Sequence, residues 1–185
     1  MTGANVYRNE IDKFSFSSDG DAADVGNLTI AIRAGAGQSS STHGYSSGGY
    51  TGPSTYRNEI DKFSFSSDGD ATDIGNLTVG RSANAGQSFS THGYNSGGST
   101  GSYSNVIDKF SFSSDGDAAD VGDLTVIRYR VTGQSSTTHG YSSGGRITGD
   151  SDTNVIDKFS FSSDGDATDV GDITVSRGYV AGQQY

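Results

Sequence analysis

The sequence predicts an all-β fold in which one structural unit is repeated four times within a single domain, residues 1–185. Three observations support this prediction. The segment IDKFSFSSDGDA occurs four times without change, beginning at Ile11, Ile60, Ile107 and Ile156. A Gly-Gln pair follows each copy at matching intervals, beginning at Gly37, Gly86, Gly133 and Gly182. The period of roughly 48 residues contains no long stretch of 3.6-residue periodicity, which favours strands over helices.

Each unit is expected to contribute four short antiparallel strands, the blade of a β-propeller. GQSSST and HGYSSGGY form an expected polar strand pair, and the aromatic segment NVIDKFSF has the period-2 character of a third strand. After the polar loop SSDGDATDVG, a fourth strand is expected, such as Leu124 to Arg128 in the third copy. A double glycine is expected to end each polar pair, at Gly48 and Gly49, Gly97 and Gly98, and Gly144 and Gly145.

The composition alone would indicate a disordered chain, because apolar residues are few and the net charge is −10. The repetition outweighs that indication. The apolar residues recur at fixed offsets, and 28 glycines with a single proline suit tight turns between short strands. With an acidic chain and no basic cluster, a nucleic-acid partner is not expected. The absence of cysteine excludes disulfides and thiolate metal sites.

No targeting or membrane segment is expected. The N-terminal sequence MTGANVYRNE has no apolar core of the kind that a signal peptide requires. The longest apolar stretch, around residues 28–32, is too short to span a bilayer. A soluble protein without a membrane partner is therefore expected, and its compartment is not specified.

The order of segments GQSSST, HGYSSGG, IDKFSF and DLTV resembles the kelch-like β-propeller repeat family. Kelch-type blades place small polar residues after a glycine, then a strand that ends in a double glycine, then an aromatic strand and a final strand after a loop. The near-identical copies are also similar to repeat proteins of phages and environmental viruses. The resemblance covers the whole chain and implies a β-propeller of four-stranded antiparallel blades. The chain departs from the family in having no tryptophan and a longer Asp-rich loop.

All four lysines of the protein occupy the same place in the repeat, at Lys13, Lys62, Lys109 and Lys158. Lysine is thus not used as a general surface residue, which indicates a contact. Because neighbouring residues on a strand point to opposite faces, the Lys face of one unit is expected to meet the Asp face of the next. We expect buried Lys–Asp bridges between adjacent units. The alternative is that the lysines reach solvent at the rim of the blade.

The two ends of the chain each hold part of a unit. The IDKF hairpin occurs four times, but complete polar strand pairs occur only at His43, His92 and His139. The tail from Gly182 is therefore expected to begin a terminal blade whose outer hairpin lies at the N-terminus. Either MTGANVY replaces the absent strand in a four-bladed monomer, or two chains form an eight-bladed ring. A second copy of the chain is thus one candidate partner, and a protein or glycan ligand is another.

The Asp-rich loops invite a calcium interpretation, because closely spaced carboxylates can wrap a hard cation. The EF-hand pattern is not matched, since the only glutamates are Glu10 and Glu59. A solvated turn whose Asp side chains satisfy local backbone amides is favoured, so no metal site and no cofactor are predicted. The loop carboxylates belong to Asp19, Asp21 and Asp24, Asp68, Asp70 and Asp73, Asp115, Asp117 and Asp120, and Asp164, Asp166 and Asp169.

The second repeated constellation is a histidine followed two residues later by a tyrosine. A ring of these side chains near a channel mouth could bind a sugar or an anion, or histidines from separate blades could share a metal. The favoured interpretation is that they pack and hydrogen-bond between blades. The pairs are His43 and Tyr45, His92 and Tyr94, and His139 and Tyr141.

No catalytic residue is predicted, and binding residues are not assigned. No serine accompanies a unique His and Asp, and no phosphate-cradling glycine motif is present. The predicted function is a non-enzymatic repeat scaffold or interaction module, for example within a viral or phage structural protein. The alternative is a multivalent carbohydrate-binding, lectin-like propeller. The copies differ mostly in linkers such as TGPSTYRNE and RITGDSDTN, and loops are where binding function usually lies.

Overall fold

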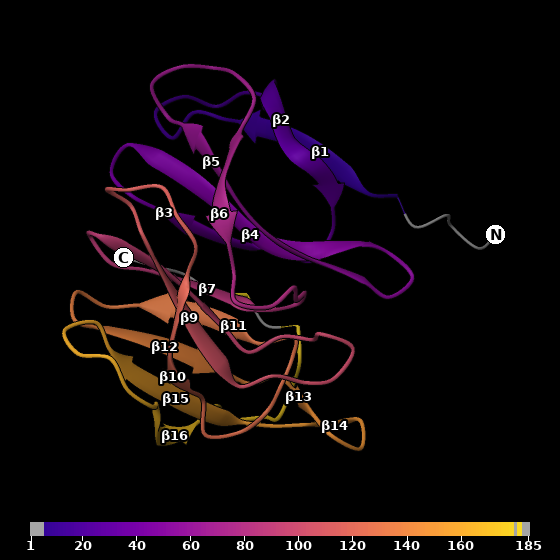
Figure 1. The fold of residues 1–185 in the computed structure, drawn as a ribbon, viewed down its shortest axis with the longest axis vertical. Helices are drawn as coiled ribbons and strands as arrows, with labels where there is room; N and C mark the ends of the chain where they lie inside the picture. Colours follow the sequence, from indigo (N-terminus) through magenta and orange to yellow (C-terminus); the bar gives the residue numbers. More distant parts are fainter. Residues whose placement is uncertain (1–5, 180, 183–185) are drawn as a thin grey trace.

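A computed structural model describes residues 6–179 and 181–182 of the protein. The described residues form sixteen strands and no helix, and all strand pairs are antiparallel (Figure 1). No described segment is a helix that could cross a membrane. The all-β prediction is therefore confirmed.

The strands group into four units, numbered 1 to 4 from the N-terminus, that match the four copies of the sequence repeat. Units 2, 3 and 4 are each a four-stranded antiparallel sheet, and unit 1 is a hairpin that corresponds to the last two strands of the others. Unit 1 contains β1 (Arg8–Lys13) and β2 (Ala23–Ile32). Unit 2 contains β3 (Ala36–Ser39), β4 (His43–Gly52), β5 (Thr55–Ser64) and β6 (Thr72–Asn76). Unit 3 contains β7 (Ala85–Ser88), β8 (His92–Ser96), β9 (Val106–Ser111) and β10 (Ala119–Asp123). Unit 4 contains β11 (Thr132–Ser135), β12 (His139–Ser143), β15 (Val155–Ser160) and β16 (Thr168–Asp172), and its linker adds the small pair β13 (Arg146–Ile147) and β14 (Ser151–Asp152).

Three of the four expected strands of a unit are confirmed, and the fourth was predicted too late in the sequence. The outer strand of unit 3 is β10, which lies in the segment expected to be loop, and residues 124–128 are not a strand. A register shift between Asp120 and Gly122 interrupts the pairing with β9, which continues to Asp123 and ends there. Beyond it, Leu124 is buried in the core and Arg128 turns toward unit 4, so burial and charge pairing override strand propensity.

The double glycines end the polar strand pair in units 3 and 4, as expected. In unit 2, β4 instead continues through Gly48 and Gly49 by a register shift and forms a longer hairpin with β5. Gly48 has a φ of 68°, in the left-handed region that glycine tolerates best. A Cβ at Gly48 would also stand closer than 3.0 Å to the carbonyl oxygen of Arg81.

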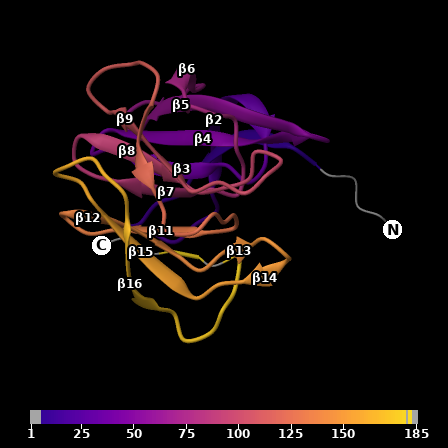
Figure 2. The same ribbon diagram turned by 60° about the horizontal axis from the view of Figure 1, so that its bottom comes forward.

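The units are stacked in sequence order, from β1 and β2 at the top of Figure 1 to β16 at the bottom. Their first strands, β3, β7 and β11, lie against one another in the middle of the stack (Figure 2). The glycine of the Gly-Gln pair makes this approach possible. A Cβ at Gly86 would stand closer than 3.0 Å to the carbonyl oxygen of Gly37, and one at Gly133 would do the same at Gly86.

Two apolar clusters hold the stack together, one between units 2 and 3 and one between units 3 and 4. In each cluster a tyrosine from one unit packs on the phenylalanines of the next, with Tyr45 stacked on Phe112 and Tyr94 on Phe161. The first cluster is Tyr45, Ile60, Ile74, Leu77, Phe110 and Ala118. The second is Tyr94, Ile107, Leu124, Phe159, Phe161 and Ala167. The core thus lies between units rather than within them.

Among the described residues the stack is open. β1 pairs only with β2, and β16 pairs only with β15, so no strand joins the two ends into a ring. Gly182 lies against Gly133, in the place of the first strand of a further unit. The expected replacement strand MTGANVY falls largely on residues 1–5, and most of the expected tail falls on residues 183–185; both stretches lie outside the described residues.

Candidate binding site

The invariant lysines form the predicted bridges between adjacent units. Three of the four pair with the first aspartate of the Asp-rich loop in the following unit, as Lys13–Asp68, Lys62–Asp115 and Lys109–Asp164. The expectation that these bridges are buried is wrong. The Lys109 side chain is 24% exposed and that of Asp164 is 57% exposed, because the loop lies at the rim of the stack.

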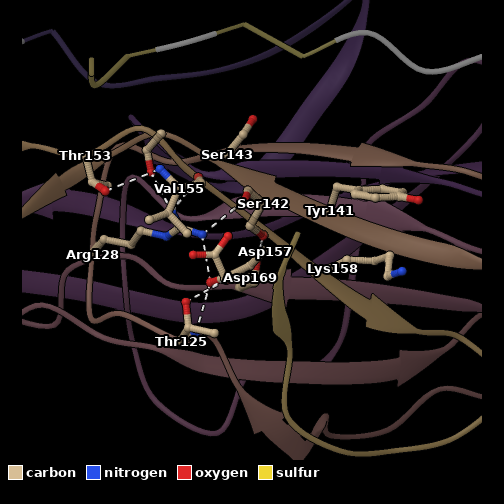
Figure 3. A network of polar contacts seen from close by, with 12 residues as sticks. Thr125, Arg128, Tyr141, Ser142, Ser143, Thr153, Val155, Asp157, Lys158 and Asp169 are labelled. Atoms are coloured by element: carbon tan, nitrogen blue, oxygen red, sulfur yellow. Dashed lines mark hydrogen bonds and ion pairs between the residues drawn. The ribbon is translucent and has the colours of Figure 1, made fainter. Parts of the chain in front are cut away.

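A buried ion pair does join the units, but it uses arginines from the variable linker. Asp157 of unit 4 accepts hydrogen bonds from the Thr125 backbone N–H (3.0 Å), the Thr125 hydroxyl (2.6 Å) and Arg128 Nη2 (2.9 Å) (Figure 3). Asp108 of unit 3 is held in the same way by Thr78 and Arg81. All four charged side chains are 0% exposed. Burial lowers the pKa of both arginines, and the facing aspartates oppose that shift.

Sequence reasoning missed this pair because only the aspartate belongs to the invariant segment. A signal was available, since Arg81, Arg128 and Arg177 stand at the same offset from the preceding IDKF copy. In unit 1 the offset is occupied by Ile32. Asp61 therefore keeps the hydrogen bonds from Thr29 but faces no equivalent arginine, and burial raises the pKa of its carboxyl group.

The Asp-rich loops contact the preceding unit. In unit 3, Asp115 pairs with Lys62, and Asp117 accepts hydrogen bonds from the Asn76 backbone N–H (2.9 Å) and side-chain amide (3.1 Å) of unit 2. Only the third aspartate has the local role that the turn interpretation expected, because Asp120 accepts from the backbone N–H of Gly122. In the part of the chain that the structure describes, no group of three or more potential metal ligands is found.

The repeated histidines and tyrosines have separate roles. Tyr45 and Tyr94 pack between units, as the favoured interpretation expected, and burial raises the pKa of Tyr94 to about 12. The histidines bond within their own turn instead. His92 Nδ1 lies 2.8 Å from the hydroxyl of Thr91, and His43 and His139 repeat this contact.

Residues that differ between units line a cavity of about 370 Å³. None of its lining residues belongs to the invariant segment, and all four units contribute to it. Four tyrosines and two arginines provide most of its functional groups. The lining is Arg33, Ala34, Tyr50, Tyr56, Ser82, Ala83, Ser99, Tyr129, Arg130 and Tyr179. We call it the Tyr–Arg pocket.

A ladder of hydrogen bonds crosses this pocket from unit to unit. The backbone N–H of Ala83 donates to Ala34 O (2.7 Å), that of Arg130 to Ala83 O (2.7 Å), and that of Tyr179 to Arg130 O (3.2 Å). All four residues have φ between 53° and 58°, which is uncommon outside glycine. Such strained positions persist where the surroundings determine them and cluster at binding sites. The ladder therefore gives the pocket a fixed backbone frame.

Arginine and tyrosine side chains stack on one another at this pocket. The Arg130 guanidinium lies 4.1 Å from the ring centroid of Tyr179 and 4.7 Å from that of Tyr129. Arg33 lies 4.9 Å from the ring centroid of Tyr50. A guanidinium that lies over an aromatic ring is a group that can bind an anion, and aromatic rings offer faces for an apolar or sugar surface. The pocket thus collects positive charge in a chain of net charge −10.

Comparison with known proteins finds no matching family model and no similar curated protein.

Proposed function

We propose that this protein is a non-enzymatic repeat scaffold of the β-propeller type, kelch-like in its blades, that presents an interaction site on its variable linkers. In such a scaffold the repeated residues build the frame and the differing residues meet the ligand. A structural role in a viral or phage particle is one setting that fits a scaffold of near-identical units.

One observation carries this proposal, namely how the two kinds of residue are distributed. The invariant segment supplies the Lys–Asp bridges, the buried aspartates and the phenylalanines of the apolar clusters. The Tyr–Arg pocket is lined only by residues outside that segment. Tyrosine and arginine side chains on a rigid frame are typical of surfaces that bind a partner.

The proposal is tested by removing the pocket chemistry without touching the frame. Arg130→Ala with Tyr179→Ala should abolish capture of a ligand that the unmodified protein binds, and leave the melting temperature nearly unchanged. A matched control is Ile127→Ala with Val175→Ala, since both side chains are exposed and lie outside the pocket. The proposal fails if the control variant loses the ligand as completely as the pocket variant, or if the pocket variant binds as well as the unmodified chain.

A second candidate function is lectin-like carbohydrate binding, which the tyrosine rings and guanidinium groups of the pocket favour. The positive charge points to acidic sugars, because arginine binds carboxylate and sulfate groups through paired N–H donors. All four units share the pocket, so the geometry supports one such site per chain rather than one per blade. Titration calorimetry with acidic and neutral oligosaccharides should show binding of the acidic series only, at one equivalent per chain. Equal binding of neutral sugars, or several equivalents, would contradict this candidate.

A further inference from the structure

The last unit exposes a copy of the surface that units 1, 2 and 3 each bury against the next. Arg177 and Thr174 occupy the places of Arg128 and Thr125, yet both are exposed, whereas Arg128 is 0% exposed. Among the described residues, Lys158 has no ion pair, although the three other invariant lysines have one. We call this surface the tail face: Tyr141, Lys158, Val170, Gly171, Thr174 and Arg177.

Gly171 marks the tail face as a contact surface in a second way. At the equivalent positions Gly26, Gly75 and Gly122, a Cβ would stand closer than 3.0 Å to a carbonyl oxygen of the next unit. At Gly171 a Cβ would meet nothing within 4 Å. Val170 is 47% exposed, whereas Ile74 at the same position of unit 2 is buried. The tail face therefore offers the full set of groups for a further unit.

The first unit exposes the opposite half of the same interface. Phe14 is 61% exposed and Phe16 is 97% exposed, whereas the equivalent Phe159 and Phe161 are buried under Tyr94. Asp12 is exposed, whereas Asp157 at the same position is 0% exposed and bound by Arg128. We call this surface the head face: Asp12, Phe14, Phe16, Asp19, Gly20 and Asp21.

The two faces are complementary in charge. The tail face carries the cations Lys158 and Arg177, and the head face carries the carboxylates Asp12, Asp19 and Asp21. The internal interfaces show the Lys–Asp pairing three times, and the Arg–Asp pairing and the contact of Tyr with Phe twice each. Because the IDKFSFSSDGDA strands are identical in all units, the head face has the same sequence as the surfaces with which units 2, 3 and 4 contact the preceding unit.

The two faces lie at opposite ends of the stack, with β1 and β2 at one end and β16 at the other (Figures 1 and 2). A single open stack therefore cannot bring them together, but two copies can. The tail segment adds a further match. Gly86 lies against Gly37 and Gly133 lies against Gly86, but Gly37 has no such glycine beside it. Gly182 occupies the same place in the repeat, so Gly182 of another copy can lie against Gly37.

We propose that the tail face of one copy binds the head face of a second copy, so that chains associate head to tail. Thr174 and Arg177 bind Asp12, Lys158 pairs with Asp19, Gly171 lies against Gly20, and Tyr141 covers Phe14 and Phe16. This interface is heterologous, so it generates a closed ring or a filament according to the rotation between copies. It goes beyond the proposed function, because it uses none of the residues of the Tyr–Arg pocket.

Two variants with one disabled face each provide the test. The head variant carries Asp12→Asn and Asp19→Asn, and the tail variant carries Lys158→Met and Arg177→Met. Light scattering of the unmodified protein should show a mass that rises with concentration above the 19.1 kDa of one chain. Each variant alone should stay at 19.1 kDa. An equimolar mixture should form a complex of two chains and nothing larger, because it contains one working tail face and one working head face.

The mixture also distinguishes loss of the interface from loss of the fold, because two misfolded variants would not form the two-chain complex. A mass of 19.1 kDa for the unmodified protein at every concentration would overturn the proposal. So would variants that assemble like the unmodified chain, or a mixture that stays monomeric while the unmodified chain assembles. A chain that closed on itself would also give a mass of 19.1 kDa at every concentration, so this outcome would overturn the proposal.

Discussion

The interface between units 1 and 2 and the interface between units 3 and 4 use the same aspartate in the same IDKF strand, but the aspartate has different partners. Asp157 receives a threonine and an arginine, whereas Asp61 receives only the threonine, because Ile32 stands where Arg128 would be. The aromatic contacts differ as well. Phe161 is buried under Tyr94, whereas Phe65 is 51% exposed, since neither described strand of unit 1 supplies a tyrosine there.

Identical segments therefore have different environments at different places in the stack. Each unit buries one of its faces only when the preceding unit supplies the matching residues. The linker arginine is the main difference, since it decides whether the invariant aspartate is a compensated charge or a partly desolvated acid with a raised pKa. Substitutions at Arg128, Gly133, Ile32 and Lys109 test how much each contact contributes.

The largest effect is expected when the third interface is made to resemble the first. Arg128→Met leaves Asp157 buried without its cation and should lower the free energy of unfolding by about 3–5 kcal/mol. Urea denaturation measures the change. Adding Asp157→Asn removes the stranded charge and should restore much of the loss. A loss that is the same with and without the second substitution would contradict the role given to the ion pair.

Close packing of the first strands gives the next largest effect. Gly133→Ala forces a Cβ against the carbonyl of Gly86 and should cost about 1–3 kcal/mol. Both substitutions are made in the monomeric tail variant, and Gly37→Ala is the matched control, because within one chain a Cβ there has no neighbour closer than Tyr45 O at 4.0 Å. Thermal unfolding of the two variants should show a lower melting temperature for the Gly133 variant only. Equal losses would mean that the glycines are required for another reason.

Making the first interface resemble the third should change the free energy of unfolding by less, and should raise it at neutral pH. The raised pKa of Asp61 contributes stability that is fully present below the ordinary value of 3.8 and is lost as pH rises through the folded-state pKa. Ile32→Arg supplies the absent cation, so it should remove this loss and stabilise the protein by about 1 kcal/mol at pH 7.

Denaturation between pH 3 and neutral pH measures that change, with Ile32→Met as the control for side-chain length. The Met variant should keep the pH dependence of the unmodified protein. If the Arg variant keeps it too, the pKa of Asp61 does not depend on the residue at position 32.

The smallest effect is expected at the exposed bridges. Lys109→Met should lower the free energy of unfolding by about 0.2–1 kcal/mol, because solvent screens the pair with Asp164. The loss should shrink further in high salt. Lys13→Met, in the more exposed bridge of the first interface, should cost less still. Thermal melts at two salt concentrations provide the measurement, and a loss of several kcal/mol at Lys109 would show that the bridge behaves as a buried one.

The features that could be predicted from the sequence are those that depend on the repeated residues alone. The order of the strands, the turn glycines and the presence of Lys–Asp bridges follow from residues that recur at fixed offsets. The position of the outer strand does not, because Leu124 and Arg128 leave the sheet to meet residues of the next unit. Strand propensity within one copy contains no information about that neighbour.

The candidate site was beyond sequence reasoning for the same reason. Tyr129 and Tyr179 lie in linkers that differ in length and composition, and Tyr50 lies in the part of β4 beyond the double glycine. Only the stacking of the units brings them to one pocket. The burial of the lysines was overestimated because the rim position of the Asp-rich loop also depends on stacking. The invariant aspartates are buried, and the arginines that face them lie outside the repeated segment.

Each invariant segment is held by the unit before it, and amide hydrogen exchange in the Asp-rich loops tests this most directly. The loops have the same sequence, so their intrinsic exchange rates are equal. In unit 3 the backbone N–H groups of Gly116 and Ala118 donate to Ile74 O and Asn76 O of unit 2, each at 2.8 Å. The equivalent Gly20 and Ala22 have no preceding unit. In the monomeric tail variant we predict strong protection at Gly116 and Ala118, and exchange at the unprotected rate at Gly20 and Ala22. Equal rates at all four amides would contradict the account.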